Sequence, residues 1–314
     1  MMLSVEDYKV YYYTSDGAVK AVDGVSLKVK KGHSIGVIGE SGCGKSTLAF
    51  GMLNLIPRPG KIAGGKIFLD NIDLLSLSPE EFRKDIRWKR ISMVFQGAMN
   101  ALNPVYKVGY QLLEPFLDHL GTEGDEEKVA KSLELVGLDR EVMNRYPHEL
   151  SGGMKQRAVI AMALILNPSL VIADEPTTAL DVIVQAQIMN LFKKLKRALD
   201  ISFIFITHDL SIEAEVAEDI YVMYAGKIVE KGSNFEIYKN PKHPYTQMLL
   251  AATPRLHEEK KLEFIPGIPP DLISPPEGCR FHPRCPHAMS ICKQKEPRLI
   301  EIEGNHWAAC HLLR

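Results

Sequence analysis

The chain has 314 residues, of which 46% are hydrophobic and 25% charged, and its formal net charge is −1. This length allows one large domain or two smaller ones, and the composition is ordinary for a soluble globular protein. The near-zero charge gives no electrostatic reason to bind nucleic acid. The longest apolar run, Ala161 to Ala173, contains Asn167-Pro168 and is too short to span a membrane, and the N-terminus lacks the apolar segment of a secretory signal. We therefore expect a cytosolic protein.

The first hundred residues are predicted to contain several strands and two helix starts. The expected strands are residues 3–13, 25–29, 34–38, 66–70 and 91–95. A turn at Ser15-Asp16-Gly17 separates the first two strands. One helix is expected over residues 45–56, where Pro57 ends it, and another begins at Ser78-Pro79-Glu80-Glu81, with a serine cap, a proline and a glutamate at the favoured positions.

The remainder of the chain predicts helices followed by more strands. Residues 107–165 show helical periodicity and no convincing strand. Strands are expected at residues 170–173 and 203–206, and a hairpin at 221–224 and 227–230. Apolar strands that alternate with helices predict an α/β fold with a mostly parallel sheet covered by helices.

A glycine-rich loop follows the strand at residues 34–38. Its sequence, Gly39-Glu40-Ser41-Gly42-Cys43-Gly44-Lys45-Ser46, matches the phosphate-binding pattern G-x-x-x-x-G-K-[ST] between a strand and a helix. Backbone N–H groups of such a loop converge on phosphate oxygens at a helix N-terminus. Lys45 is expected to reach the β- and γ-phosphates, and Ser46 to ligate Mg²⁺. The predicted nucleotide contacts are Gly39, Ser41, Gly42, Cys43, Gly44, Lys45, Ser46 and Thr47. Cys43 is expected to be a small loop residue, with oxidation sensitivity from its place at a helix N-terminus as the alternative.

An acidic pair ends the strand at residues 170–173. Asp174 and Glu175 lie at the carboxyl end of this strand, the edge where α/β sheets bind ligands. Asp174 is expected to hold Mg²⁺, directly or through water. Glu175 is expected to polarise the attacking water as general base.

A turn about twenty residues before the acidic pair carries the most specific signal. Here the chain reads Leu150-Ser151-Gly152-Gly153-Met154. The Ser151 hydroxyl and the N–H groups of Gly152 and Gly153 form an anion-binding turn at a helix N-terminus. With the phosphate loop and the acidic pair, this turn makes roughly residues 3–240 resemble the ATP-binding subunits of ABC transporters. The resemblance implies a P-loop NTPase cassette with a RecA-like core, an antiparallel β subdomain and an α-helical subdomain over about residues 100–165.

The same resemblance assigns roles to further residues and implies a partner. Gln96 matches the family's glutamine that senses Mg²⁺ and water and faces the membrane partner. His208 matches the histidine that contacts the γ-phosphate. Asp181 matches a residue of the loop that crosses the subunit interface. In this family two subunits pack head-to-tail, so each Ser-Gly-Gly turn caps the γ-phosphate held by the other subunit. The adenine is expected to stack on Tyr12, with Tyr13 as the alternative.

Four of the five cysteines lie in the last 36 residues. Cys279, Cys285, Cys292 and Cys310 follow the spacing C-x5-C-x6-C-x17-C. Disulfides fit a cytosolic protein poorly, and a proline-rich tail with few long apolar runs would be stabilised by a metal. Four thiolates suit an iron–sulfur cluster or tetrahedral zinc, although the paired short spacings of compact zinc sites are missing.

The tail also carries a second resemblance. The segments HPYTQMLLAATP and RCPHA resemble the C-terminal region of dipeptide and oligopeptide permease ATPase subunits. This resemblance implies a [4Fe–4S] cluster on the four cysteines, with Zn²⁺ as the alternative. His282, His287, His306 and His311 are expected to be structural or solvent-facing. The predicted domains are residues 1–240 for the ATP-binding cassette and 241–314 for a small, irregular, cysteine-rich module.

Together these patterns predict an ATPase that energises the import of dipeptides or oligopeptides. The expected partners are a second ATP-binding subunit (itself or a paralogue), two transmembrane permease subunits and, indirectly, an extracellular or periplasmic peptide-binding protein. The chain would then lie on the cytoplasmic face of the membrane. Nickel or short oligosaccharides are alternative cargoes. A soluble ABC ATPase acting on nucleic acid or ribosomes, and a redox sensor that gates transport through the cluster, are the rival hypotheses.

Overall fold

The computed structural model describes residues 1–97, 101–208, 215–252 and 264–313. It divides into two compact units. The first unit comprises residues 1–29, 34–75 and 206–314, and the second comprises residues 30–33 and 76–205. The last two residues of the HPYTQMLLAATP segment, 253 and 254, lie outside the described residues.

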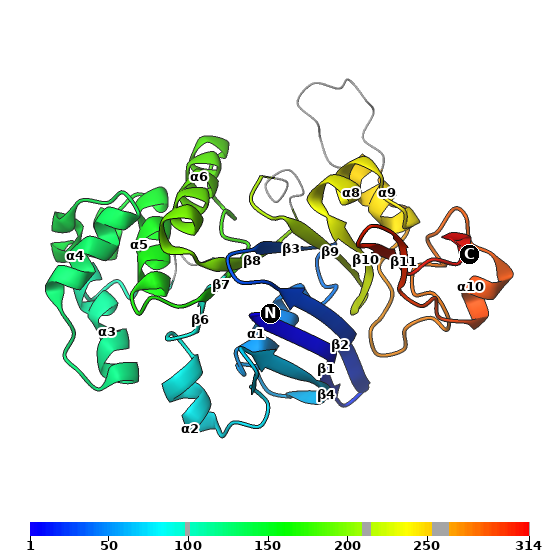
Figure 1. The fold of residues 1–314 in the computed structure, drawn as a ribbon, viewed down its shortest axis with the longest axis horizontal. Helices are drawn as coiled ribbons and strands as arrows, with labels where there is room; N and C mark the ends of the chain where they lie inside the picture. The colour runs from blue at the N-terminus through cyan, green and yellow to red at the C-terminus, as the bar shows by residue number, and fades with distance from the viewer. Residues whose placement is uncertain (98–100, 209–214, 253–263, 314) are drawn as a thin grey trace. The chain divides into compact units, whose positions relative to one another are not determined.

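The first unit contains an antiparallel sheet with the strand order β2-β1-β4-β5 (Figure 1). Its strands are β1 (Leu3–Thr14), β2 (Gly17–Val29), β4 (Gly60–Leu69) and β5 (Ile72–Asp73). The turn between β1 and β2 lies where the sequence predicts it. β2 begins earlier than predicted, because its first residues pair with the end of β1, as Ala18 does with Tyr13. This sheet is the expected antiparallel subdomain.

A second set of strands in the first unit carries the phosphate-binding loop. The strands are β3 (Ser34–Ile38), β9 (Asp219–Tyr224) and β10 (Lys227–Ser233). β3 pairs with β9 in parallel, whereas β9 and β10 form the predicted antiparallel hairpin. Its turn residues, Ala225 and Gly226, have φ angles of 45° and 83°, the left-handed backbone that two-residue hairpins require. The sheet is therefore mixed rather than mostly parallel in this unit.

Part of the C-terminal tail is regular and extends this sheet. β11 (Ile300–Glu303) pairs with β12 (His306–Ala308), and β12 pairs with β10. His306 is buried, and one of its ring nitrogens lies 2.7 Å from Oε1 of the fully buried Glu230. The predicted irregular module is thus only partly irregular, because two short strands of the tail belong to the sheet.

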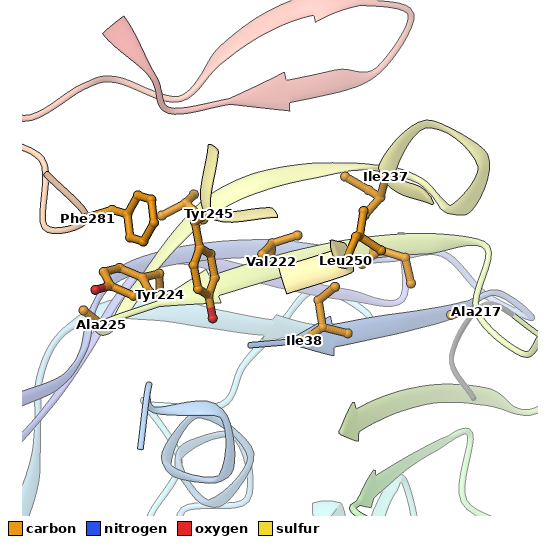
Figure 2. Packing of buried hydrophobic residues seen from close by; sticks show 11 residues of the cluster. Ile38, Ala217, Val222, Tyr224, Ala225, Ile237, Tyr245, Leu250 and Phe281 are labelled. Atoms are coloured by element: carbon orange, nitrogen blue, oxygen red, sulfur yellow. The ribbon is translucent and has the colours of Figure 1, made fainter. Parts of the chain in front are cut away.

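The helices of the first unit are α1 (Lys45–Met52), α8 (Asn234–Lys239), α9 (Pro244–Ala251) and α10 (Ser290–Gln294), followed by a 3₁₀ turn at His311–Leu313. Two of these helices, α8 and α9, contribute to an apolar core. Figure 2 shows the rings of Tyr224, Tyr245 and Phe281 gathered at one end of the cluster, with Ile237 and Leu250 at the other. The ring centroids of Tyr224 and Tyr245 are 4.6 Å apart. In this core, Phe281 from the C-terminal region packs against Tyr224 of strand β9.

The second unit contains most of the helices. Its elements are α2 (Pro79–Glu81), a π-helical turn (Phe82–Ile86), β6 (Ile91–Val94), α3 (Val108–Leu120), α4 (Glu126–Leu135), 3₁₀ turns at Arg140–Asn144 and Pro147–Glu149, α5 (Gly152–Leu164), β7 (Leu170–Asp174), α6 (Val182–Leu199) and β8 (Ser202–Thr207). α3, α4 and α5 lie together in Figure 1. Val129 and Leu133 are fully buried on α4, as the helical periodicity predicts.

Two local predictions in the second unit have a clear outcome. Ser78 and Glu81 form the reciprocal capping box: Ser78 Oγ accepts a hydrogen bond from the Glu81 N–H, and the Glu81 carboxylate accepts one from the Ser78 N–H. β6 and β7 pair in parallel, which is the arrangement that a strand–helix–strand pattern favours. Because the cap residues face their own backbone, this helix start could be predicted without knowing the fold.

Candidate functional site

The phosphate-binding loop joins β3 to α1 in the first unit, as predicted. Gly44, immediately before α1, has a φ of 106°. A Cβ atom there would collide with the carbonyl oxygen of Ala21, so both the backbone angle and the space require glycine. Ser41 and Gly42 are exposed, and the position of a Cβ on Gly42 has no neighbour within 4 Å. The outer side of the loop is therefore open for phosphate groups.

Lys45 lies folded against this loop. Its ammonium group donates hydrogen bonds to the carbonyl oxygens of Gly39 at 2.7 Å and Glu40 at 2.9 Å. The residue is 6% exposed. These neutral carbonyls hold the ammonium at the loop without neutralising its charge, so Lys45 can still attract phosphate.

Of the three neighbouring tyrosines, Tyr12 contacts the first turn of α1. Its hydroxyl is 3.4 Å from Oγ1 of Thr47. Tyr11 instead donates a 2.6 Å hydrogen bond to Asp23, and Tyr13 is half-exposed. The stacking of adenine on Tyr12 stays a prediction, and the place of Tyr12 beside Thr47 favours it over Tyr13.

Cys43 does not have the environment of a reactive thiol. The residue is 5% exposed. Burial raises the pKa of its thiol despite the ammonium of Lys45, whose Nζ is 3.8 Å from Sγ. Since the thiolate is the reactive form, burial argues against the alternative of an oxidation-sensitive thiol, and Cys43 fits the expected small loop residue.

The second unit brings together two predicted catalytic residues. The Nε2 group of Gln96, just after β6, donates a 2.7 Å hydrogen bond to Oε2 of Glu175, just after β7. The hydroxyl of Thr178 donates to the same oxygen at 2.9 Å. Asp174, the last residue of β7, is almost fully buried. Glu175 has a φ of 47°, a conformation that is costly for a non-glycine residue and often found at functional sites. Thr178 is a contact that the sequence did not suggest.

The Ser-Gly-Gly turn forms the N-terminus of α5. Oγ of Ser151 accepts a hydrogen bond from the Met154 N–H at 3.3 Å, and Ser151 is exposed. Asp181 caps α6 in the same way, accepting from the Val184 N–H at 2.9 Å. A Cβ on Gly153 would lie 2.9 Å from Cγ1 of Val184, so this glycine lets the starts of α5 and α6 approach each other.

His208 directly follows β8 and is exposed.

The four C-terminal cysteines line a single small cavity. Its lining also includes His282, His287 and His311. No disulfide joins the cysteines. Burial and the neighbouring thiols raise the pKa of Cys279 to about 11, and burial also raises the pKa of Cys285 and Cys310. Over residues 1–97, 101–208, 215–252 and 264–313, no three Cys, His, Asp or Glu side chains are grouped so that they could hold a metal ion.

The tail histidines largely have partners within the protein. His306 contacts Glu230, as described above. His282 Nδ1 lies 2.9 Å from the carbonyl oxygen of Cys279, and His311 Nε2 lies 2.8 Å from that of Lys295. These contacts support a structural role for these three residues. Within the described part of the chain, no helix is long and apolar enough to cross a membrane.

Comparisons with known proteins agree with these features. Residues 22–178 match the family "ABC transporter", and residues 229–292 match "Oligopeptide/dipeptide transporter, C-terminal region". The dipeptide transport ATP-binding protein DppD of Caldanaerobacter subterraneus is 44% identical over 99% of this chain and 97% of its own length. DppD of Bacillus subtilis is 46% identical over 99% and 94%.

Solved structures give the same result for the fold. A dimeric ATP-binding cassette in a post-hydrolysis state, bound to ADP and Pi, has a TM-score of 0.64 and 31% identity, covering 74% of this chain and 99% of that chain. A component of an ABC transporter complex from Clostridium perfringens has a TM-score of 0.65 and 27% identity, covering 76% and 91%. The chain therefore belongs to the ATP-binding proteins of ABC transporters and carries the C-terminal region found in oligopeptide and dipeptide transporters.

Proposed function

We propose that this ATPase energises the import of dipeptides or oligopeptides through an ABC membrane permease. The observation that carries the proposal is the match of residues 229–292 to the C-terminal region of oligopeptide and dipeptide transporters. Relatives named for dipeptide or oligopeptide transport match nearly the whole chain at 44–46% identity. We divide the chain accordingly into a cassette, residues 1–240, and a C-terminal module, residues 241–314.

The residues described above take the following roles in ATP hydrolysis. Lys45 binds the β- and γ-phosphates, and Ser46 and Asp174 hold Mg²⁺, which neutralises phosphate charge. Glu175 accepts a proton from the attacking water. Gln96, whose amide contacts the Glu175 carboxylate at 2.7 Å, senses Mg²⁺ and the attacking water and faces the membrane partner. His208 contacts the γ-phosphate.

The Ser-Gly-Gly turn acts in a second subunit. Ser151 is exposed at the N-terminus of α5, a 13-residue helix, where N–H groups and the helix dipole attract anions. We propose that this turn, with Gly152 and Gly153, caps the γ-phosphate bound by a partner ATPase, which is a second copy or a paralogue. Asp181, at the exposed start of α6, lies at the same interface. A dimeric cassette among the similar solved structures supports this arrangement.

Exposed apolar side chains of the second unit support a membrane-protein partner. Phe95 precedes Gln96, and Val105, Tyr106 and Tyr110 are all exposed, with the rings of Tyr106 and Tyr110 stacked at 5.1 Å. Exposed apolar groups of this kind mark interaction surfaces. We propose that they contact the transmembrane permease subunits, so that the protein lies on the cytoplasmic face of the membrane.

Reconstitution tests the transport proposal. The chain would be assembled with its partner ATPase and permease subunits in proteoliposomes, and phosphate release measured with the binding protein loaded with dipeptide, pentapeptide, nickel or an oligosaccharide. Peptide should stimulate turnover and accumulate inside the vesicles. The Glu175→Gln variant is the matched control and should abolish both signals. Stimulation by nickel or oligosaccharide alone would refute the peptide assignment.

We further propose that Cys279, Cys285, Cys292 and Cys310 bind a [4Fe–4S] cluster. Four thiols around one cavity match the donor set of such a cluster. The cavity volume is about 10 Å³, room for about one water molecule, so the cysteine side chains would have to turn to admit a cluster.

Cysteine variants test this second proposal. Protein purified without oxygen should contain about four irons per chain and absorb visible light. Serine at any of the four positions should lower the iron content strongly, whereas Cys43→Ser, a buried cysteine outside the cavity, should not. Full iron content in all four single variants, or zinc in place of iron in the wild type, would refute the cluster. Unchanged ATPase activity on reduction and re-oxidation would indicate a structural cluster rather than a redox sensor.

A further inference from the structure

Glu40, the second residue of the phosphate-binding loop, is held by two side chains from far along the chain. Its N–H donates a 2.8 Å hydrogen bond to the hydroxyl of Tyr245, 205 positions away. Its carboxylate accepts two hydrogen bonds from Arg284, at 2.6 Å from Nη1 and 2.9 Å from Nη2, across 244 positions. Tyr245 is fully buried and the Arg284 side chain is 4% exposed. Tyr245 lies in the segment HPYTQMLLAATP and Arg284 in RCPHA, but the resemblance gives neither residue a role.

The contact with Tyr245 determines the direction of a carbonyl that holds Lys45. The Gly39 carbonyl and the Glu40 N–H belong to one peptide unit, and in a trans peptide the two groups point in opposite directions. On one side the Glu40 N–H meets the Tyr245 hydroxyl, and on the other the Gly39 oxygen accepts a 2.7 Å hydrogen bond from Lys45 Nζ. Because the peptide plane is rigid, fixing one group fixes the other. Tyr245 therefore acts on the ammonium of Lys45 through a single peptide unit.

Both side chains are themselves firmly placed. The Tyr245 ring packs against Tyr224 and Phe281, as Figure 2 shows, with centroid separations of 4.6 and 5.3 Å. Nε of Arg284 donates to the carbonyl oxygen of Pro266 at 2.8 Å, and the guanidinium lies 5.9 Å from the centre of the Tyr224 ring. Groups held in this way keep their geometry without a large entropic cost on binding.

Arg284 also balances a charge that would oppose nucleotide binding. Glu40 places a carboxylate in the loop that must bind the phosphates of ATP, and like charges at short range repel. The guanidinium of arginine is always charged in proteins, so Arg284 neutralises the Glu40 carboxylate that it contacts. A bidentate arginine is the side chain best suited to compensate a carboxylate.

We propose that Tyr245 and Arg284 are positioning residues for ATP binding, which fix the Gly39–Glu40 peptide and neutralise Glu40 so that Lys45 can bind phosphate. The proposal rests on ATP binding by the cassette, and is independent of the transported cargo and of the cysteine site. Arg284 precedes Cys285 by one position. The C-terminal region is thus in direct contact with the nucleotide-binding loop.

Equilibrium binding of MgATP to the full-length protein tests the proposal. Tyr245→Phe removes only the hydroxyl and should raise the Kd about fivefold, the effect of losing one hydrogen bond to a buried N–H. Arg284→Ala should raise the Kd about tenfold or more, and Arg284→Lys should lie between it and the wild type. Arg298→Ala is the matched control, because Arg298 is an exposed arginine of the same region, and it should leave the Kd within about twofold.

A double variant separates positioning from a general loss of folding. In Glu40→Gln/Arg284→Ala both charges are removed, so the repulsion of phosphate is absent and much of the affinity lost in Arg284→Ala should return. Thermal unfolding of each variant is recorded in parallel. The proposal would be overturned if Tyr245→Phe and Arg284→Ala bound MgATP as tightly as Arg298→Ala. It would equally be overturned if the double variant bound no better than Arg284→Ala.

Discussion

Replacing Asp23 on strand β2 tests how the C-terminal region is held to the rest of the first unit. Its carboxylate pairs with the guanidinium of Arg280, accepts a 2.6 Å hydrogen bond from Tyr11, and lies 3.7 Å from Nζ of Lys227. Arg280 also donates to the carbonyl oxygen of Ala225 at 2.5 Å. We expect Asp23→Asn, which keeps the size but removes the charge, to destabilise the protein substantially.

The magnitude follows from the burial of the partners. The side chains of Arg280 and Asp23 are 8% and 14% exposed, and breaking a buried ion pair by removing one charge costs about 3–5 kcal/mol. Lys227 is more exposed and has a second acidic partner, Glu296, at 2.8 Å, so its pairing with Asp23 adds little. Since Arg280 keeps its hydrogen bond to Ala225, we expect the lower end of the range, about 3 kcal/mol.

The pH dependence provides a second measurement. Burial raises the pKa of Asp23, but hydrogen bonding to Tyr11 and the charges of Lys227 and Arg280 outweigh it, and the net pKa is lowered. A lowered carboxyl pKa gives stability that is fully present above the unfolded-state value of about 3.9 and is lost as the pH falls through the folded-state value. The difference between wild type and Asp23→Asn should therefore be constant near neutrality and shrink below about pH 4.

Urea unfolding at several pH values is the assay, with Asp16→Asn as the control. Asp16 is exposed in the turn between β1 and β2, so its replacement should change the unfolding free energy by no more than about 0.5 kcal/mol. If Asp23→Asn were as stable as Asp16→Asn at pH 7, the Asp23–Arg280 pair would not anchor the tail, and the reasoning would be refuted.

Three further substitutions test the site and the fold. Glu175→Gln should lower the rate of phosphate release by about 10²–10⁴-fold while MgATP still binds, because only the proton acceptor is lost; normal turnover would disprove the general-base role. Gly44→Ala should abolish MgATP binding in an equilibrium assay, because a Cβ would collide with the carbonyl oxygen of Ala21; retained affinity would contradict the loop geometry. Glu230→Gln should destabilise the protein by about 2–3 kcal/mol in urea unfolding. The two oxygens of the buried carboxylate accept from the Lys242 and His243 N–H groups at 2.6 and 2.9 Å, and the amide NH₂ of glutamine would face one of these donors. A change no larger than that of the exposed Glu303→Gln would contradict this reasoning.

Features that depend on nearby residues could be predicted from the sequence. The phosphate-binding loop requires a preceding strand, glycines and a following helix, and all three lie within a dozen or so residues. The Ser78–Glu81 capping box and the Ala225-Gly226 hairpin turn are likewise fixed by local backbone geometry. The contact between Gln96 and Glu175 spans 79 positions, and no local pattern predicts it. The role of Glu175 follows from its place at a strand end, whereas that of Gln96 comes only from the family resemblance.

The C-terminal region was harder to predict because its regular structure depends on residues far away in the sequence. β11 and β12 have four and three residues, too short for a clear alternation of apolar and polar positions. They become strands because β12 pairs with β10, where Glu230 lies opposite Ala308. Proline-rich sequence around them suggested irregular structure, and the pairing to an existing sheet edge outweighed this local preference.

Two buried arginines show why the contacts of the tail with the cassette could not be predicted from the composition. Arg280 and Arg284 read as solvent-exposed charges, since arginine is rarely buried without a partner. Their partners, Asp23 and Glu40, lie more than 240 positions earlier, so neither pair can be inferred from spacing. Both arginines lie between Cys279 and Cys285. Arg284 contacts the phosphate-binding loop, and Arg280 contacts strand β2. The cysteine region therefore contacts the nucleotide-binding loop directly through Arg284 and belongs to the same compact unit as that loop, rather than being an appendage to it.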